Sequence, residues 1–199
     1  MNIWELDIQF VQGGKSAFAT LHTTSTADAA RLDNFKGSAW PADEWTPLQL
    51  VRNPLNKDEA ASQELGDWAM INVKGSILNL SQRALDAVLP QIAHCGQVLP
   101  VQFDEAPYVI FNVTRVIDAL DEPASAVVYF PSSGRVAEIE KFVFKPEAVK
   151  DEWIFKIPQR PGAHNFVTDR FVELVRHHKL TGFDFQRVWS DEEQEREAA

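Results

Sequence analysis

Residues 107–118 read PYVIFNVTRVID, and this stretch decides the fold class. Apolar and polar side chains alternate along it, with Val109, Phe111 and Val113 set against Tyr108, Asn112 and Thr114. Alternation with a period of two residues indicates a β-strand. One apolar face and one mixed face are typical of a half-buried strand in an antiparallel sheet. We therefore predict a strand over residues 108–117.

The segments around this strand supply the other elements. Further strands are predicted at residues 67–73, 98–103, 126–130, 136–144, 153–157 and 183–189. A helix is predicted over residues 80–94, with Ser81 as its N-cap, Gly96 as its stop and Pro90 bending or ending its last turn. A second helix follows Thr168 as its N-cap and ends at Gly182. A short helix over residues 57–65 would end at Gly66.

These elements predict an α+β protein with a mainly antiparallel sheet, two main helices and a single domain. Residues 1–65 comprise an N-terminal hairpin and an irregular, tryptophan-rich region of the same domain. Residues 66–189 form the core, and residues 190–199 form an acidic tail that we expect to be disordered.

The N-terminal stretch QGGKS, residues 12–16, raises the question of a phosphate-binding loop. Such a loop needs a glycine at the position that Gln9 occupies, so that backbone N–H groups can wrap a phosphate. The stretch before it, WELDIQF, alternates as a strand does. We therefore interpret Gly13 and Gly14 as a hairpin turn, with residues 16–21 as the return strand.

The composition narrows the class of partner. The chain of 199 residues has a net charge of −10, and the tail contributes five acids and one arginine to it, which leaves −6 on the rest. An acidic chain without a basic stripe is not expected to bind nucleic acid or a membrane surface. A single cysteine, Cys95, forms no internal disulfide. The N-terminus has no secretory pattern, so the expected location is cytoplasmic.

Candidate catalytic groups are few. His177 and His178 are adjacent, whereas two helical metal ligands would be four positions apart, and Cys95 beside His94 is better interpreted as a small hydrophobic residue. No metal site and no cofactor are predicted. One alternative is an enzyme whose site gathers distant polar residues, namely Asp118, His164 and Asp169.

Six motifs, in order, resemble a known family. They are LSQRALDAVLP (80–90), VLPV (98–101), YVIFNVTRVIDALDEPAS (108–125), FK (155–156), VTDRFVELV (167–175) and LTGFDFQRVW (180–189). The chain over residues 66–189 resembles immunity protein family eleven of bacterial polymorphic toxin systems. The resemblance implies a bacterial, cytoplasmic, non-enzymatic protein that binds and neutralises a cognate toxin domain.

The positions that match the family pattern are Ser81, Pro100, Asn112, Asp118, Asp121, Ser125, Phe155, Lys156, Asp169, Gly182 and Phe185. We interpret most of them as structural. Ser81, Asp169 and Gly182 suit helix ends, and Pro100 suits an edge strand. Asp121 and Ser125 suit a turn, with the Asp121 side chain accepting backbone N–H groups.

Toxin-contacting residues are expected where acids meet an exposed loop. The candidates are Asp43, Glu44 and Trp45 in the loop GSAWPADEWTP (37–47), and Asp104 and Glu105 in a turn. Trp45 would serve as an aromatic anchor of the interface. A basic toxin, such as a nuclease, would be attracted to these acids. The remaining alternative is an oligomeric scaffold subunit that associates with its own copies through apolar strands.

Overall fold

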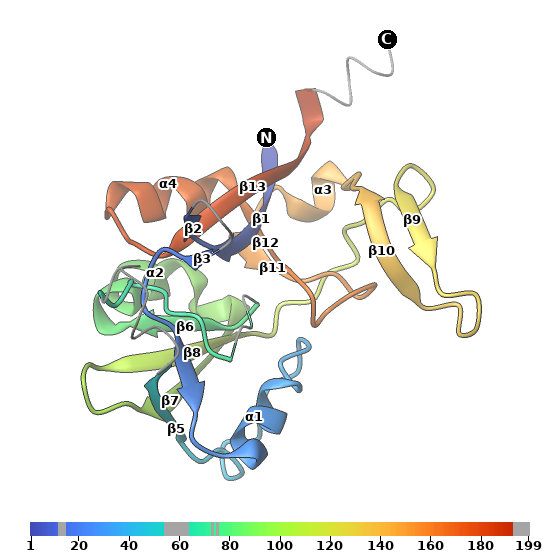
Figure 1. The fold of residues 1–199 in the computed structure, drawn as a ribbon. Helices are drawn as coiled ribbons and strands as arrows, with labels where there is room; N and C mark the ends of the chain where they lie inside the picture. Colours follow the sequence, from blue (N-terminus) through green and yellow to red (C-terminus); the bar gives the residue numbers. More distant parts are fainter. Residues whose placement is uncertain (12–14, 54–63, 73, 75, 193–199) are drawn as a thin grey trace.

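A four-stranded antiparallel sheet, the terminal sheet, joins the two ends of the chain (Figure 1). The computed structural model describes residues 1–11, 15–53, 64–72, 74 and 76–192. The strand order is β11 (Ile154–Phe155), β12 (Asn165–Thr168), β1 (Asn2–Ile8) and β13 (Phe183–Ser190). β1 pairs with β12 on one side and β13 on the other, so the first strand of the chain lies inside the sheet.

A second sheet has five strands in the order β4 (Leu21–Thr23), β5 (Leu48–Arg52), β7 (Gly96–Gln102), β8 (Tyr108–Val113) and β6 (Leu78–Ser81). β5 and β7 run parallel, and the other neighbours are antiparallel. The prediction of an α+β protein with mostly antiparallel sheets is confirmed, although the strands form separate sheets. β4, β5, β6 and β12 were not predicted.

The described residues contain four α-helices, and two of them are the predicted main helices. α2 (Gln82–Ile92) and α4 (Asp169–His177) correspond to the predicted helices, whereas α1 (Thr26–Leu32) and α3 (Pro146–Val149) were missed. No helix among these residues is long and apolar enough to cross a membrane. The predicted helix over 57–65 falls mostly on residues that the structure does not describe.

The helix ends confirm part of the capping prediction. Ser81 caps α2 by accepting a hydrogen bond from the Ala84 N–H at 3.1 Å. Pro90 lies in the last turn of α2, which is followed by a 3-10 turn, Ala93–Cys95, before Gly96 begins β7. Thr168 precedes α4 as predicted, but its hydroxyl donates to the Glu152 carbonyl instead of accepting from the helix.

A two-stranded hairpin projects from the body, and we call residues 126–141 the arm (Figure 1). It consists of β9 (Ala126–Tyr129) and β10 (Val136–Lys141). A smaller hairpin joins β2 (Phe10–Val11) to β3 (Lys15–Ser16), which confirms the hairpin at the N-terminus. Its return strand is shorter than expected. The predicted Gly13–Gly14 turn lies outside the described residues.

Three hydrophobic clusters hold these parts together. The first packs α2 and α4 with residues of both sheets, including Leu6, Phe111 and Phe171. The second lies on the other face of the terminal sheet, where Ile3 and Phe166 meet the base of the arm. The third covers the outer face of the second sheet with α1 and the tryptophan-rich loop.

Two predictions about the second sheet are wrong. β8 is buried on both faces because the first cluster covers Phe111 and Val113 while the third covers Tyr108 and Ile110, so the strand is not half-exposed. Pro100 lies on β7, which is an inner strand between β5 and β8. Proline is tolerated there because it precedes the first residue pair between β7 and β5, Leu48 with Val101.

The predicted strand over residues 67–73 is also wrong for the residues described. Trp68 and Ile71 make isolated bridges to Leu80 and Leu21, with no continuous ladder. Trp68 is fully buried and donates its indole N–H to the Ile77 carbonyl at 2.8 Å. The apolar character of this segment therefore reflects core packing rather than strand pairing.

Candidate functional site

The tryptophan-rich loop places the acids of the first candidate surface in solvent. Asp43 and Glu44 are exposed, and a turn bond joins the Glu44 N–H to the Pro41 carbonyl at 3.1 Å. Asn112 anchors the start of the loop, because its Nδ2 atom donates to the Ser38 carbonyl at 2.9 Å. The loop is pinned by its aromatic residues, as predicted.

Trp45 is half-buried, so it is not a free anchor. Its indole N–H donates to the Pro100 carbonyl at 2.9 Å, and the Arg31 guanidinium lies 4.3 Å from the centre of its ring. The Trp40 ring packs edge-on against the Trp45 ring, with the two ring centres 5.4 Å apart. Trp45 thus fixes the loop on β7 and holds Asp43 and Glu44 in place.

The second candidate pair, Asp104 and Glu105, is exposed beyond the end of β7. Glu105 accepts a hydrogen bond from Arg52 at 2.5 Å, whereas Asp104 forms no ion pair with any residue that the structure describes. Because β5 and β7 are parallel, the chain before β5 and the chain after β7 lie toward opposite ends of this strand pair. The two acidic loops are therefore two separate candidate contacts.

Most of the motif positions have structural roles. Asp169 accepts hydrogen bonds from Asn2 and Trp4, and Ser81 also donates to Asp67 at 2.8 Å. Ser125 donates to the Asp121 carbonyl at 2.7 Å, so it is the backbone of Asp121 that forms the turn rather than its side chain. Phe155 is in the second cluster, and Phe185 packs against the first.

Gly182 does not end α4, which stops at His177. Its φ angle of +89° favours glycine, and an added Cβ would lie 2.3 Å from the Trp68 carbonyl oxygen. Gly182 therefore lets the chain entering β13 approach the Trp68 backbone closely. The motif position was identified correctly, but its physical role is this close approach.

Lys156 is the exception among the motif positions. Its side chain is 1% exposed, and among the described residues its Nζ atom has no hydrogen-bond partner. Burial lowers the pKa of this amine to about 8. The charged form of a buried amine without a partner destabilises the folded protein. Because the side chain is buried, it is not accessible to a ligand at the surface.

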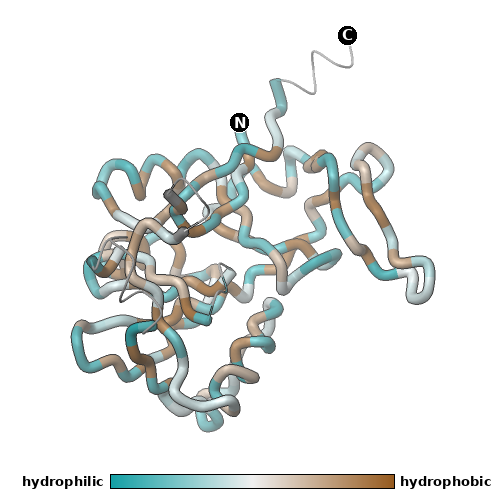
Figure 2. Tube along the Cα trace, viewed as in Figure 1, coloured by the Kyte–Doolittle hydropathy of each residue, from teal (hydrophilic) through white to brown (hydrophobic). Residues whose placement is uncertain are grey.

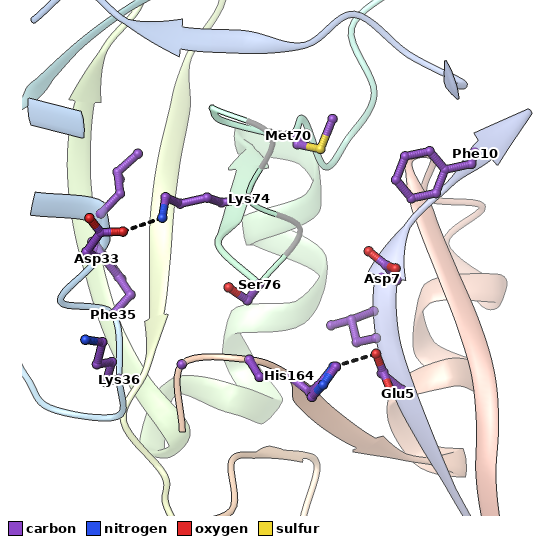
Figure 3. Close-up of a pocket in the computed structure, with 14 residues that line it drawn as sticks. Glu5, Asp7, Phe10, Asp33, Phe35, Lys36, Met70, Lys74, Ser76 and His164 are labelled. Atoms are coloured by element: carbon purple, nitrogen blue, oxygen red, sulfur yellow. Dashed lines mark hydrogen bonds and ion pairs between the residues drawn. The ribbon is translucent and has the colours of Figure 1, made fainter. Parts of the chain in front are cut away.

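Three concavities meet at the turn Arg160–His164. One of them, the central pocket, has a volume of about 710 Å³ and lies between β1, the end of α1 and the residues Met70, Lys74 and Ser76 (Figure 3). A side pocket of about 450 Å³ shares Glu5 and His164 with it. An open groove of about 870 Å³ lies between this turn and the tip of the arm.

Two ion pairs lie on opposite walls of the central pocket, which Lys36 also lines (Figure 3). Lys74 binds Asp33, and the His164 Nδ1 atom lies 2.5 Å from the Glu5 Oε1 atom. Burial raises the pKa of Asp7, although a hydrogen bond from the Ile8 N–H opposes that shift. The pocket lining is thus charged, and four of its charged side chains form the two ion pairs.

The three residues proposed for an enzyme do not meet. His164 lines the central pocket, whereas Asp118 is exposed and pairs with Lys145 at 3.2 Å, and Asp169 is engaged by Asn2 and Trp4. Within the described residues, no group of three His, Cys, Asp or Glu side chains is placed to hold a metal ion. Cys95 is buried, and this burial raises the pKa of its thiol.

The comparison with protein families bears on the part of the chain that holds the arm, the turn and α4. Residues 101–190 match the immunity protein family Imm11. The match confirms the resemblance that the motif order indicated. It covers a shorter part of the chain than residues 66–189, so Ser81 and Pro100 lie before it. No curated protein matches the chain.

Proposed function

We propose that this protein binds a cognate toxin domain directly and thereby neutralises it. The observation that carries the proposal is the match of residues 101–190 to the Imm11 immunity protein family. It is supported by the absence of a shared cavity for the candidate catalytic residues Asp118, His164 and Asp169. Such a protein inhibits its target by covering a surface of it, and it does not need to catalyse a reaction.

The charge of the chain supports a basic partner. The net charge is −10, and complementary long-range fields accelerate association and select partners. A nuclease fits this description, because its cleft binds phosphates through cationic groups. An acidic protein that covers such a cleft competes directly with the nucleic acid.

The proposed toxin contacts are Asp43, Glu44, Trp45, Asp104 and Glu105. Asp43 and Glu44 are the best placed of these, because the half-buried Trp45 ring holds their turn against β7. Asp104 and Glu105 would form a second contact, in which a toxin cation competes with Arg52 for Glu105. Acids held in place lose little conformational entropy on binding.

Co-expression with the neighbouring toxin-like gene product tests this proposal. We expect growth to be restored, and we expect a complex with an inactivated toxin that weakens as the salt concentration rises. The double variant Asp43→Lys and Glu44→Lys should weaken binding about tenfold or more, as loss of interface contacts does. The matched control carries Glu147→Lys and Asp151→Lys, two acids whose side chains are 83% and 79% exposed.

Three outcomes separate the parts of the proposal. Rescue and binding that are insensitive to all four substitutions would keep the immunity function and discard the acidic contacts. Equal losses in the variant and the control would indicate net charge rather than a defined surface. Failure of the wild-type chain to bind or rescue, with each neighbouring toxin-like product tried, would refute the function.

A further inference from the structure

An open groove lies between the arm and the turn at residues 158–163, and we call it the arm groove. The charge of its lining is positive, opposite to the net charge of the chain. Its described lining contains three cations, Lys36, Arg135 and Arg160, and one carboxylate, Glu122. The chain as a whole has a net charge of −10. A local excess of positive charge on an acidic body is a distinct electrostatic feature, because it attracts the group that the rest of the surface repels.

The three cations are available, whereas the single acid is already engaged. Among the described residues, none of the Lys36, Arg135 and Arg160 side chains forms a hydrogen bond or ion pair. Glu122 accepts a hydrogen bond from the Tyr129 hydroxyl at 3.0 Å and another from Gln159 at 2.7 Å. These two bonds hold the arm to the turn at 158–163 and leave the groove with a net positive lining.

The same groove exposes apolar surface. Val128, Tyr129 and Phe130 are 41%, 46% and 50% exposed, and they are consecutive on the arm. Figure 2 shows hydrophobic residues along this projecting segment. Tyr129 and Phe130 line the groove, while Val128 faces Glu138 across the hairpin. Contiguous exposed apolar residues beside unpaired arginines are typical of the centre of a protein interface.

We propose that the arm groove is a specificity-determining part of the toxin interface and takes an acidic, apolar segment of the cognate toxin. This inference rests on the proposed function. Carboxylates of the segment would pair with the guanidinium groups of Arg135 and Arg160, which present two N–H donors in one plane. An apolar side chain of the segment would pack against Phe130 and Tyr129.

The reversal of sign explains how such a groove selects its toxin. A basic toxin approaches the acidic body in many orientations that are similar in energy. A groove of the opposite sign rejects a basic segment through like-charge repulsion and accepts an acidic one, so it fixes the orientation of the complex. The arm groove is therefore expected to contact an acidic segment of the toxin, whereas the acidic loops are expected to contact its basic surface.

The test measures the affinity of an inactivated cognate toxin for the wild-type chain, for the double variant Arg135→Glu with Arg160→Glu, and for Phe130→Ser. The control is Arg170→Glu, an exposed arginine on α4 whose side chain is 4.0 Å from Asp151. We expect the double variant and Phe130→Ser each to lose about thirtyfold or more in affinity, as interface hot spots do. The control should change affinity by less than about threefold.

A charge exchange identifies the segment. Acidic surface residues of the toxin are changed to arginine one at a time, and one of them should restore binding to the double variant while weakening binding to the wild type. Phe130→Cys gives a second readout, because Cys95 is buried and the introduced thiol is then the reactive one. Toxin binding should protect it from a maleimide reagent.

The results distinguish this inference from the function on which it rests. If the toxin binds the wild type and the double variant equally, the arm groove is not an interface, but the immunity function stands. If the toxin does not bind the wild type, both fall. If sedimentation shows that the wild type is a dimer and the double variant a monomer, a second copy of the chain occupies the groove and the proposal is overturned. Circular dichroism should show that every variant is folded.

Discussion

Trp4 donates its indole N–H to the Asp169 carboxylate at 2.8 Å, although 165 positions separate the two residues. Asp169 also accepts the Asn2 backbone N–H at 2.8 Å and the Asn2 amide at 3.1 Å. One carboxylate in the first turn of α4 therefore fastens the start of β1. The sequence motif contains this aspartate, but only the fold brings its partners to it.

Asp169→Ala is expected to destabilise the protein by about 1–3 kcal/mol, because three donors lose their shared acceptor. Chemical denaturation measures the free energy of unfolding. Asp151→Ala is the control, since its side chain is 79% exposed and its nearest cation is 4.0 Å away. It should change stability by less than about 0.5 kcal/mol. Equal effects of the two substitutions would contradict this role of Asp169.

The same carboxylate predicts a dependence on acid. Burial opposes its ionisation, but the hydrogen bonds from Trp4 and Asn2 outweigh that effect and lower the pKa of Asp169 below 3.8. A carboxyl whose pKa is lowered by folding stabilises the protein above its unfolded-state pKa, and that contribution is lost as the pH falls through its folded-state pKa. Stability curves of the wild type and Asp169→Ala should therefore converge in acid.

Lys156 predicts a second pH dependence of the same sign, but at alkaline pH. Burial lowers the pKa of its amine from 10.5 to about 8. Between these values the unfolded chain holds a proton that the folded chain lacks, so stability should increase with pH. Lys156→Met should remove this slope and raise stability at pH 7 by about 3 kcal/mol. Urea unfolding between pH 7 and pH 10 measures it.

The control for Lys156 is Lys145→Met. Lys145 is exposed and pairs with Asp118 at 3.2 Å, so its loss should leave the pH slope unchanged. A destabilised Lys156→Met variant would contradict the expectation and would indicate that the buried amine has a partner that stabilises it. The comparison therefore tests whether burial of an amine without a hydrogen-bond partner causes the pH slope, since the two lysines differ in exposure but have the same side chain.

Gly182→Ala should be severely destabilising. The added Cβ would lie 2.3 Å from the Trp68 carbonyl oxygen, and the φ angle of +89° is already unfavourable for alanine. We expect a loss of about 3 kcal/mol or more, measured by thermal or chemical unfolding. Gly134→Ala is matched to it, because Gly134 also has a positive φ angle, +65°, but meets nothing within 4 Å. It should cost only about 1 kcal/mol.

Arg31→Ala should loosen the tryptophan-rich loop. Arg31 lies 4.3 Å from the centre of the Trp45 ring and donates to the Thr46 carbonyl at 2.9 Å. We expect faster amide hydrogen exchange over residues 37–47, with exchange in α4 unchanged. If Asp43 and Glu44 bind the toxin, its affinity should fall about tenfold or less, because the acids remain but are less ordered. Unchanged exchange in the loop would contradict the role of Arg31.

The sequence by itself predicted those features that depend on local chemistry. Alternation of apolar and polar residues located β1 and β8, and helical periodicity located α2 and α4, because each pattern reports the local geometry of one element. Short apolar or aromatic runs located β7, β9, β10, β11 and β13. The cap at Ser81 followed from its hydroxyl and the helix behind it. The order of six motifs also indicated the family that residues 101–190 match.

Only the tertiary structure decided what those elements do together. Asn165–Thr168 is a strand because β1 and β11 lie on both sides of it, and four residues are too few for periodicity to reveal it. Pro100 lies inside a sheet because β5 pairs only beyond it. The arm groove joins Lys36, Arg135 and Arg160 from three distant segments, and charge can reverse locally because folding, rather than sequence order, determines which side chains become neighbours.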